Sequence, residues 1–459
     1  MVAFGTSGLR GLAEELTDEV VGAHVAAFLS LYPNVRELVI GRDARASTPR
    51  IADAVARAAN GVGIVAVDCG VLPTPALAGF AAQGGALATM VTGSHIPADR
   101  NGLKFYGPAG EITKAEEASL VAVAQSSGPV EMGQGAGDDG GTARDNYVEQ
   151  FVSTFGAGAL SGLRVGFWQH SSAARDVLPE VLSRLGAEVV VLGPSDSFVA
   201  VDTEAIDGNV RRQLQAWAAE NTLDAIVSTD GDADRPLVAD ANGAVIPGDV
   251  IGPLVAQFLG ARDVVTTVSA NTVVERLGVF ESVHRTRIGS PYVIEKMSDI
   301  ATNGESLVVG YEPNGGFLTG STVSLGGGDL EPLMTRDAML PIVAMLALAK
   351  EMPLAKRVGQ LPSRRTATDR LKEVPADVSQ RLVGRILAGE TVLFPDDLGD
   401  ICEIDTIEGA RVHFSSGRIV TVRASGNAPE LRCYVEAESD VLASSTLQEV
   451  LRRIRSEIA

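Results

Sequence analysis

Three stretches of the chain repeat one pattern: an apolar segment, an amphipathic helix, a second strand, further helix, and a last strand that ends in a polar loop. The repeats begin at ELVIGRD (37–43), LRVGFWQH (163–170) and DVVTTVSAN (263–271). Apolar runs without alternation are typical of strands that helices cover on both faces. We therefore predict three α/β/α domains of similar build.

Local signals refine this prediction. A hydroxyl followed by proline at Thr48–Pro49, Thr74–Pro75 and Ser290–Pro291 indicates three helix starts, with the hydroxyl as cap and proline at the first helical position. A long helical stretch is expected from Asp329 to Glu351. Beyond it the pattern changes to a helix, short strands with turns and a terminal helix, which predicts a smaller α+β domain.

The expected domain boundaries are 1–145, 146–250, 251–360 and 361–459. The polar, glycine-rich stretch 125–141 is interpreted as a linker. It contains a GxGxxG pattern at Gly135, Gly137 and Gly140, but no strand precedes it and no helix start follows at once, so it fails as a dinucleotide-binding motif.

Composition narrows the class of protein. The formal charge of −20 over 459 residues argues against a nucleic-acid-binding protein, whose affinity comes from Lys and Arg contacts to phosphate. No apolar stretch is long enough to span a bilayer, and the N-terminus lacks the pattern of a signal peptide. The three cysteines have no metal-ligand spacing, so we expect a reduced, cytoplasmic setting.

The first polar loop lies in VTGSHIPADRNGLKFY (91–106), which presents Ser94, His95 and Lys104 directly after an apolar run. Gly, Ser, Pro and Asn are also what a simple turn is made of. The alternative is that the serine is presented for chemistry. The loop alone leaves both interpretations open.

The second polar loop, STDGDADRP (228–236), places Asp230, Asp232 and Asp234 at alternate positions. Carboxylates this close repel one another unless a cation or several donors lie among them, and oxygen ligands suit Mg²⁺. An EF-hand calcium loop is excluded, because Arg235 replaces its glycine and Ala241 its final glutamate. A metal site is favoured over a solvated acidic turn, and Arg235 is placed to hold an anion.

Three further loops are weak signals when taken singly. RASGNAPELR (423–432) joins two arginines to a turn of small residues and could bind an anion. FGTSGLRG (4–11) carries Arg10, and YEPNGG (311–316) carries Glu312, which could equally make a structural hydrogen bond.

Together these loops resemble the signatures of the α-D-phosphohexomutase family, in the same order and over nearly the full chain. The resemblance rests on TGSHIP with NGLK, DGDADR, YEPNGG, RASGNAP and FGTSGLRG, and it is strongest to bacterial phosphomannomutases and phosphoglucomutases. It implies three similar α/β/α domains and a smaller fourth domain around a central cleft. This chain departs from the family pattern at Gly93, Ile96, Asn314 and Asn427, and the last two bear on the preferred sugar.

The resemblance also implies a reaction and its residues. Phospho-Ser94 exchanges a phosphoryl group with a hexose 1- or 6-phosphate through a hexose 1,6-bisphosphate, which also serves as activator. The implied catalytic residues are Ser94, His95, Lys104, Arg10 and Arg235. Those implied to bind Mg²⁺ are Ser94, Asp230, Asp232 and Asp234, and those implied to bind substrate are Glu312, Asn314, Gly315, Arg287, Arg423, Ser425, Gly426, Asn427 and Arg432.

Hexose phosphates are therefore the expected partners, with mannose preferred and glucose also accepted, and we expect a monomer or homodimer that binds neither nucleic acid nor membrane. Three alternatives remain at this point. The chain could be a phosphoglucosamine mutase, or a Mg²⁺-dependent sugar phosphatase with a serine nucleophile. A sugar-phosphate-binding protein is the weakest alternative, because it would need neither Ser94 nor the aspartates.

Overall fold

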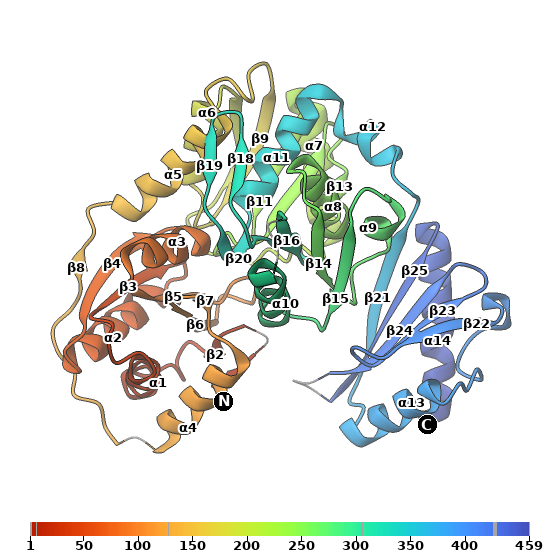
Figure 1. Cartoon of the computed structure of the whole chain (residues 1–459), viewed down its shortest axis with the longest axis horizontal. Helices are drawn as coiled ribbons and strands as arrows, with labels where there is room; N and C mark the ends of the chain where they lie inside the picture. Colours follow the sequence, from red (N-terminus) through yellow and green to blue (C-terminus); the bar gives the residue numbers. More distant parts are fainter. Residues whose placement is uncertain (1, 6, 127, 304–305, 426–428, 459) are drawn as a thin grey trace. The chain divides into compact units, whose positions relative to one another are not determined.

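The computed structural model describes residues 2–5, 7–126, 128–303, 306–425 and 429–458. The chain forms two compact units, which are described separately here (Figure 1). The first comprises Met1–Val264 and Gly289–Val358, and the second comprises Val265–Ile288 and Gly359–Ala459.

The first unit begins with an eight-stranded sheet in the order β1-β2-β6-β5-β3-β4-β8, with β7 paired to β6. The apolar strand β3 is parallel to both β4 and β5, whereas β6 is antiparallel to β5. The strands are β1 (Ala3–Phe4), β2 (Leu9–Leu12), β3 (Glu37–Arg42), β4 (Val65–Val71), β5 (Leu87–Val91), β6 (Arg100–Gly107), β7 (Gly110–Glu111) and β8 (Gly137–Asp138). The helices are α1 (Asp18–Ser30), α2 (Thr48–Gly61), α3 (Thr74–Gly84) and α4 (Lys114–Ser126).

A second sheet follows in the order β10-β9-β11-β12-β13, in which β9 is parallel to β10 and β11. Its strands are β9 (Arg164–His170), β10 (Glu188–Pro194), β11 (Ala225–Thr229), β12 (Pro236–Asp240) and β13 (Val245–Ile246). The helices of this part are α5 (Thr142–Phe155), α6 (Val177–Arg184), α7 (Gly208–Asn221) and α8 (Gly248–Phe258).

The third repeat completes the first unit with antiparallel strands β16 (Val308–Tyr311), β17 (Phe317–Thr319) and β20 (Leu333–Asp337), and with the hairpin of β18 (Val323–Leu325) and β19 (Gly328–Leu330). Its helices are α10 (Ser290–Asn303), α11 (Met339–Glu351) and α12 (Leu354–Gly359). Strand β14 (Asp263–Thr267) crosses the boundary between the two units.

The second unit contains the antiparallel sheet β21-β25-β24-β23-β22. Its strands are β21 (Arg365–Lys372), β22 (Ile401–Asp405), β23 (Ala410–Phe414), β24 (Ile419–Ala424) and β25 (Glu430–Ala437), and β15 (Ser282–Thr286) also belongs to this unit. Its helices are α9 (Val273–Arg276), α13 (Ala376–Leu387), the short 3₁₀ helix η1 (Asp396–Leu398) and α14 (Asp440–Ile458). The predicted smaller α+β domain is thus confirmed.

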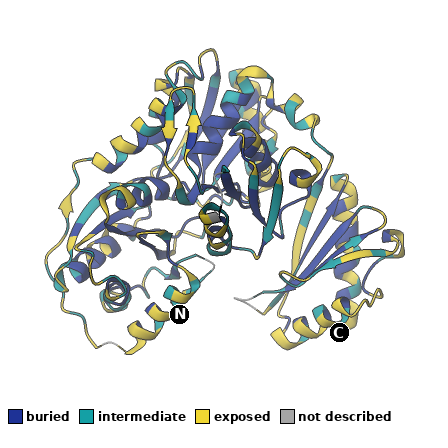
Figure 2. Ribbon diagram, viewed as in Figure 1, coloured by how far each residue is buried: buried dark blue, intermediate teal, exposed yellow. Residues whose placement is uncertain are grey.

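Burial explains why the predicted strands were recognisable. β5 and β11 are buried along their whole length, which matches their unbroken apolar sequences (Figure 2). The three α/β/α domains and the smaller C-terminal domain are confirmed. Among the described residues, no helix is both long and apolar enough to cross a membrane.

The predicted helix caps are wrong in one respect. Thr48 and Thr74 are the first residues of α2 and α3, so the following prolines occupy the second position, and neither helix has a side-chain cap bond. The Thr48 hydroxyl donates instead to Asp43 (2.8 Å), and that of Thr74 donates to Asp232 (2.7 Å). Buried carboxylates therefore take the hydroxyls that a local pattern assigns to capping.

Two other segments differ from expectation. The helical stretch expected from Asp329 begins only at Met339, because the preceding residues pair as β19 and β20. The glycine-rich linker contributes β8, which pairs in parallel with β4.

Candidate active site

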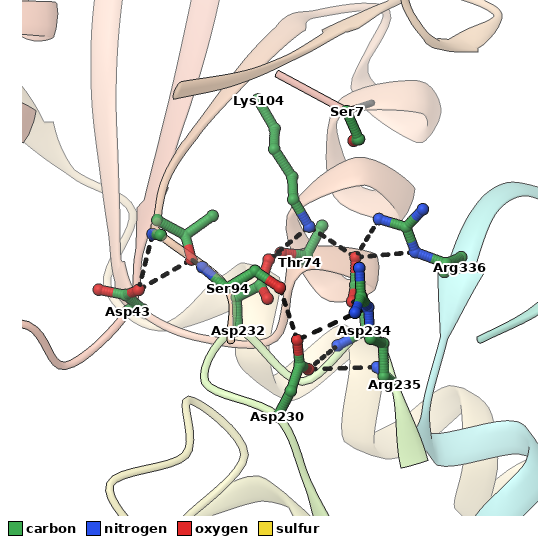
Figure 3. Close-up of polar contacts among 12 residues, drawn as sticks. Ser7, Asp43, Thr74, Ser94, Lys104, Asp230, Asp232, Asp234, Arg235 and Arg336 are labelled. Atoms are coloured by element: carbon green, nitrogen blue, oxygen red, sulfur yellow. Dashed lines mark hydrogen bonds and ion pairs between the residues drawn. The ribbon is translucent and has the colours of Figure 1, made fainter. Parts of the chain in front are cut away.

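Three loops of the first unit, each at the end of a strand, carry predicted site residues. The serine loop, residues 92–97, follows β5; the metal loop, residues 230–235, follows β11; and the sugar loop, residues 312–316, follows β16. Ligands of α/β sheets bind beyond the carboxyl ends of strands. The serine and metal loops contact each other directly, and Arg336 on β20 contacts Asp234 of the metal loop (Figure 3). The sugar loop meets the same Arg336 through Glu312.

Ser94 has a strained and buried position. Its φ is 52°, which is uncommon for a residue with a Cβ, and its exposed fraction is 3%. The hydroxyl donates to Asp230 Oδ2 at 2.7 Å, and its Oγ lies 3.3 Å from His95 Nδ1. Burial, together with the charge of Arg235, lowers the pKa of His95 to about 4. The serine loop therefore places one hydroxyl between a carboxylate and a neutral imidazole.

Arg45 and Asp43 hold the serine loop in this conformation. The buried Arg45 guanidinium donates to the carbonyl oxygens of Ser94 (2.8 Å) and Ile96 (2.7 Å) and to Asp43 (3.0 Å). Asp43 also accepts from the hydroxyl of Thr92 (2.8 Å). Hydrogen bonds from a charged donor are stronger than neutral ones. Sequence reasoning missed this pair, although it follows the recognised strand ELVIG directly.

The metal loop approaches the serine loop closely. A Cβ on Gly231 would lie 2.6 Å from the carbonyl oxygen of Ser94, so only glycine fits there. Ala233 adopts a φ of 56°, which turns the chain sharply between two of the aspartates. Asp230, Asp232 and Asp234 are fully buried, and one ligand atom from each lies within 4.8 Å of the others.

The residues present fit a divalent cation. Lys104 Nζ lies 2.6 Å from Asp232 Oδ2 and 2.5 Å from Asp234 Oδ2. The other oxygen of each of these two carboxylates, Oδ1, is buried and has no hydrogen-bond partner. Buried polar atoms without partners are costly, and a hard cation would satisfy these oxygens.

Charge balance in the trio gives a second reason. Burial would raise the pKa of Asp234, but Arg336 and Lys104 outweigh it and hold the pKa below the usual value. For Asp230, burial and the charges of Asp232 and Asp234 raise the pKa well above the usual value. A divalent cation among the three carboxylates would offset the repulsion that raises the pKa of Asp230.

Two arginines flank the serine and metal loops. Arg10 donates to the carbonyl oxygen of Thr92, next to the serine loop. Arg235 is only partly buried, and its Nε lies 3.7 Å from Asp234 Oδ1 and 4.0 Å from Asp230 Oδ2. These loose ion pairs leave the Arg235 guanidinium able to bind an anion.

The sugar loop is a tight turn. The Gly315 N–H donates to the Glu312 carbonyl (2.9 Å), and Gly315 has a φ of 90°. Asn314 Oδ1 accepts from the backbone N–H of Gly316 (2.9 Å), so its side chain helps to form the turn. The Glu312 carboxylate is buried and meets Arg336 Nη1 at 3.1 Å.

Arg336, on β20, links the sugar loop to the metal loop, and sequence reasoning missed it. Its Nη2 lies 2.8 Å from Asp234 Oδ2, and its Nη1 also donates to Ser290 Oγ (2.9 Å). The Ser290 hydroxyl in turn donates to Glu111 (2.8 Å), which accepts from Ser7 as well. No local sequence signal could have revealed Arg336, because its partners are far away in the chain.

The remaining predicted residues lie in the second unit. Arg423 and Arg432 are cross-strand neighbours on β24 and β25. Arg423 Nη1 donates to Glu408 (2.8 Å), and the buried Nε atoms of both arginines have no partner. Ser425 N donates to the Glu430 carbonyl (2.9 Å), and Arg287 is exposed next to β15. The predicted residues Gly426 and Asn427 lie outside the described residues.

The chain is similar to known proteins over almost its whole length. Four models described as phosphoglucomutase/phosphomannomutase match in succession: α/β/α domain I at 1–129, domain II at 145–243, domain III at 247–365 and the C-terminal domain at 364–453. Two relatives are phosphomannomutases. The one from Sinorhizobium fredii is 43% identical over 99% of both chains, and the one from Salmonella muenchen is 39% identical over 100% of this chain and 96% of its own.

The fold is shared more widely. A crystal structure of a Thermus thermophilus protein is 24% identical and covers 99% of both chains, with a TM-score of 0.79. At that identity the likeness concerns the fold alone.

Proposed function

This chain belongs to the phosphoglucomutase/phosphomannomutase family, and we propose that its preferred substrate is mannose phosphate, processed through Ser94. The enzyme is an isomerase that interconverts hexose 1-phosphates and hexose 6-phosphates. The observation that carries the assignment of Ser94 is its hydrogen bond to Asp230 within the buried carboxylate trio.

The reaction takes two phosphoryl transfers. In the first, the bond between phosphorus and Ser94 Oγ breaks while phosphorus bonds to the free hydroxyl oxygen of a hexose monophosphate. The proton of that hydroxyl passes through a base to Ser94 Oγ, and the product is a hexose 1,6-bisphosphate. After this intermediate turns around, Ser94 Oγ attacks its other phosphorus, and the proton of the serine hydroxyl passes to the departing sugar oxygen. Ser94 is phosphorylated again at the end.

Four side chains are assigned to charge and proton handling during these transfers. His95 Nδ1 lies 3.3 Å from Ser94 Oγ. Burial lowers the pKa of His95, so its imidazole is neutral and only weakly basic, and we assign it to hydrogen bonding at the serine oxygen. Lys104, Arg10 and Arg235 supply positive charge. Phosphoryl transfer is catalysed mainly by positioning and by electrostatic stabilisation, and much less by covalent chemistry of the protein. Burial strengthens their effect, because electrostatic interactions weaken in water.

Asp230, Asp232 and Asp234, with Ser94, would hold Mg²⁺, since Asp232 and Asp234 each have a buried oxygen without a hydrogen-bond partner. When bound, the ion would neutralise charge on the phosphoryl oxygens. Lys104 pairs with the Oδ2 atoms of Asp232 and Asp234, which leaves their Oδ1 atoms available to the ion.

Substrate recognition is assigned to two loops. Glu312, held in a turn formed with Asn314 and Gly315, would accept hydrogen bonds from sugar hydroxyls that mannose and glucose share. The phosphate that does not react is assigned to Arg423, Ser425 and Arg432, together with Arg287, Gly426 and Asn427. Arginine suits this task because it binds phosphate in a bidentate manner.

A second function, a serine-dependent sugar phosphatase, differs in a measurable product. We propose to incubate the enzyme with mannose 1-phosphate or glucose 1-phosphate, Mg²⁺ and a trace of the hexose 1,6-bisphosphate. Formation of 6-phosphate and of free phosphate should be followed together. We expect 6-phosphate from both sugars with almost no free phosphate. Stoichiometric release of phosphate would identify a phosphatase instead.

Three further features belong to the proposal. Hexose 1,6-bisphosphate would act as an activator because it can phosphorylate Ser94 again after an intermediate is lost. We also propose a cytoplasmic location and a monomer or homodimer as the working form.

A further inference from the structure

Arg336 places a permanent positive charge against the carboxylate assigned to the sugar. Its exposed fraction is 3%, and its Nη1 lies 3.1 Å from Glu312 Oε2. The same guanidinium also contacts Asp234 and Ser290. An arginine side chain stays protonated in proteins, so this group carries its positive charge throughout the working range of pH.

The ion pair with Arg336 changes which substrate groups the Glu312 carboxylate can bind. A buried carboxylate without a partner attracts an ammonium group, whereas one paired with a guanidinium offers only hydrogen bonding to neutral hydroxyls. In a 2-amino-2-deoxyhexose phosphate the ammonium group on C2 is next to the C3 hydroxyl. A Glu312 bound to that hydroxyl would bring the ammonium group close to Arg336.

We infer that Arg336 is a specificity-determining residue that rejects hexose phosphates carrying a cationic amino group on C2. The inference rests on the proposed function, because it takes Glu312 as the residue that contacts the sugar. It also gives the cause of the discrimination between hexose and 2-amino-2-deoxyhexose phosphates, which is repulsion between the Arg336 guanidinium and the C2 ammonium group rather than lack of space.

Other charged groups lie close to the Arg336–Glu312 pair and contribute to the electrostatic potential there. Asp234 and Glu111 face Arg336, and Arg235 interacts with both Glu312 and Arg336. Glu204 interacts with Glu312, Arg235, Asp202 and Asp249. The same groups are present in the wild type and in the variants, so the substitution itself removes only the Arg336 charge. Removal of the Arg336 charge therefore shifts the balance in favour of a cationic substrate, whatever the background.

The test compares substrates on the same enzyme. The kcat/KM for glucosamine 1-phosphate is divided by that for glucose 1-phosphate, in wild type and in Arg336→Gln, Arg336→Met and Arg336→Lys. We expect the ratio to rise about tenfold or more in the Gln and Met variants, since Coulomb interactions in buried sites are of this order. The Lys variant keeps the charge, so its ratio should change less than about threefold by the same principle.

Two controls separate charge from space and from general damage. N-acetylglucosamine 1-phosphate has a larger but uncharged substituent on C2. The ratio of its kcat/KM to that of glucose 1-phosphate should therefore not rise in any variant. Arg364, in the second unit, is also buried and paired with a carboxylate, that of Glu436. Arg364→Gln is expected to lose stability without a change in either ratio. An equal gain for the N-acetyl sugar would overturn the inference.

A wild-type measurement keeps the inference testable if the variants fail to fold. The amino group of glucosamine 1-phosphate loses its proton at about pH 8, as amino groups do when the neighbouring carbons carry electron-withdrawing oxygens. The wild-type ratio should therefore rise between pH 7 and pH 9.5. A flat ratio contradicts the inference, while an enzyme that isomerises neither glucose nor mannose 1-phosphate contradicts the proposed function instead.

Discussion

The hydroxyl of Ser94 donates a hydrogen bond of 2.7 Å to Asp230, which joins the serine loop after β5 to the metal loop after β11. The contact spans 136 residues of sequence. It requires the positive φ of Ser94, which costs stability, and the missing Cβ of Gly231, which lets the two loops approach. This strained, buried position supports the proposal that the serine is held for chemistry rather than for a turn.

Asp232→Asn should weaken metal binding and turnover together. The substitution removes one negative charge from the trio and replaces an oxygen ligand by a poorer one. We expect Mg²⁺ affinity, measured by titration calorimetry on the metal-free protein, to fall about tenfold or more. EDTA should abolish wild-type activity, and added Mg²⁺ should restore it. If chelation leaves the rate unchanged, the trio is structural.

Arg45→Lys should loosen the serine loop. Lysine keeps the charge beside Asp43, but its three donors cannot replace the contacts that the guanidinium makes to backbone carbonyls. A loss of roughly 2–3 kcal/mol in unfolding free energy is expected, together with a lower kcat. Urea unfolding and steady-state kinetics measure both. As a control, the exposed Arg50→Lys should change stability by less than about 0.5 kcal/mol.

Structural features that depend on neighbouring residues could be predicted from the sequence, whereas contacts between residues far apart in the chain could not. Apolar runs such as LATMV (87–91) marked buried strands, and polar residues after them marked the site, because both signals are local. Arg45 and Arg336 were missed because their partners lie far away in sequence. The strand β20, with its polar end at Asp337, forms only because β17 pairs with it.

Asp337→Asn should change how stability depends on pH. Burial raises the pKa of Asp337 to about 6, although it accepts hydrogen bonds from Tyr147 and from the N–H of Met339. Between about pH 4 and pH 6 the folded protein therefore binds more protons than the unfolded chain, so this residue contributes stability at low pH that is lost as pH rises through 6.

The asparagine variant lacks this titration but keeps the accepting oxygen. Its unfolding free energy relative to wild type should therefore rise with pH over that window, by at most about 3 kcal/mol. Urea unfolding at pH 4, 5, 6 and 7 measures the difference. A difference that stays constant across the window would show that Asp337 does not titrate there.

Glu312→Ala should impair both sugars alike. Mannose and glucose differ only at C2, and the hydroxyls assigned to Glu312 are common to them. Loss of hydrogen bonds to a charged group costs roughly 1.5–3 kcal/mol each, so kcat/KM should fall about 100-fold for both, with KM raised and kcat lowered. A large loss for one sugar alone would show that Glu312 senses C2.

The phosphorylation state of Ser94 decides whether the enzyme works through a phosphoserine. Wild type and Ser94→Ala should each be incubated with Mg²⁺ and hexose 1,6-bisphosphate and then analysed by intact mass and peptide mapping. We expect one phosphoryl group on wild type, located on Ser94 and passed on to added hexose monophosphate, and none on the folded but inactive variant. Full mutase activity in Ser94→Ala, or a phosphoryl group on another residue of the wild type, would contradict this mechanism.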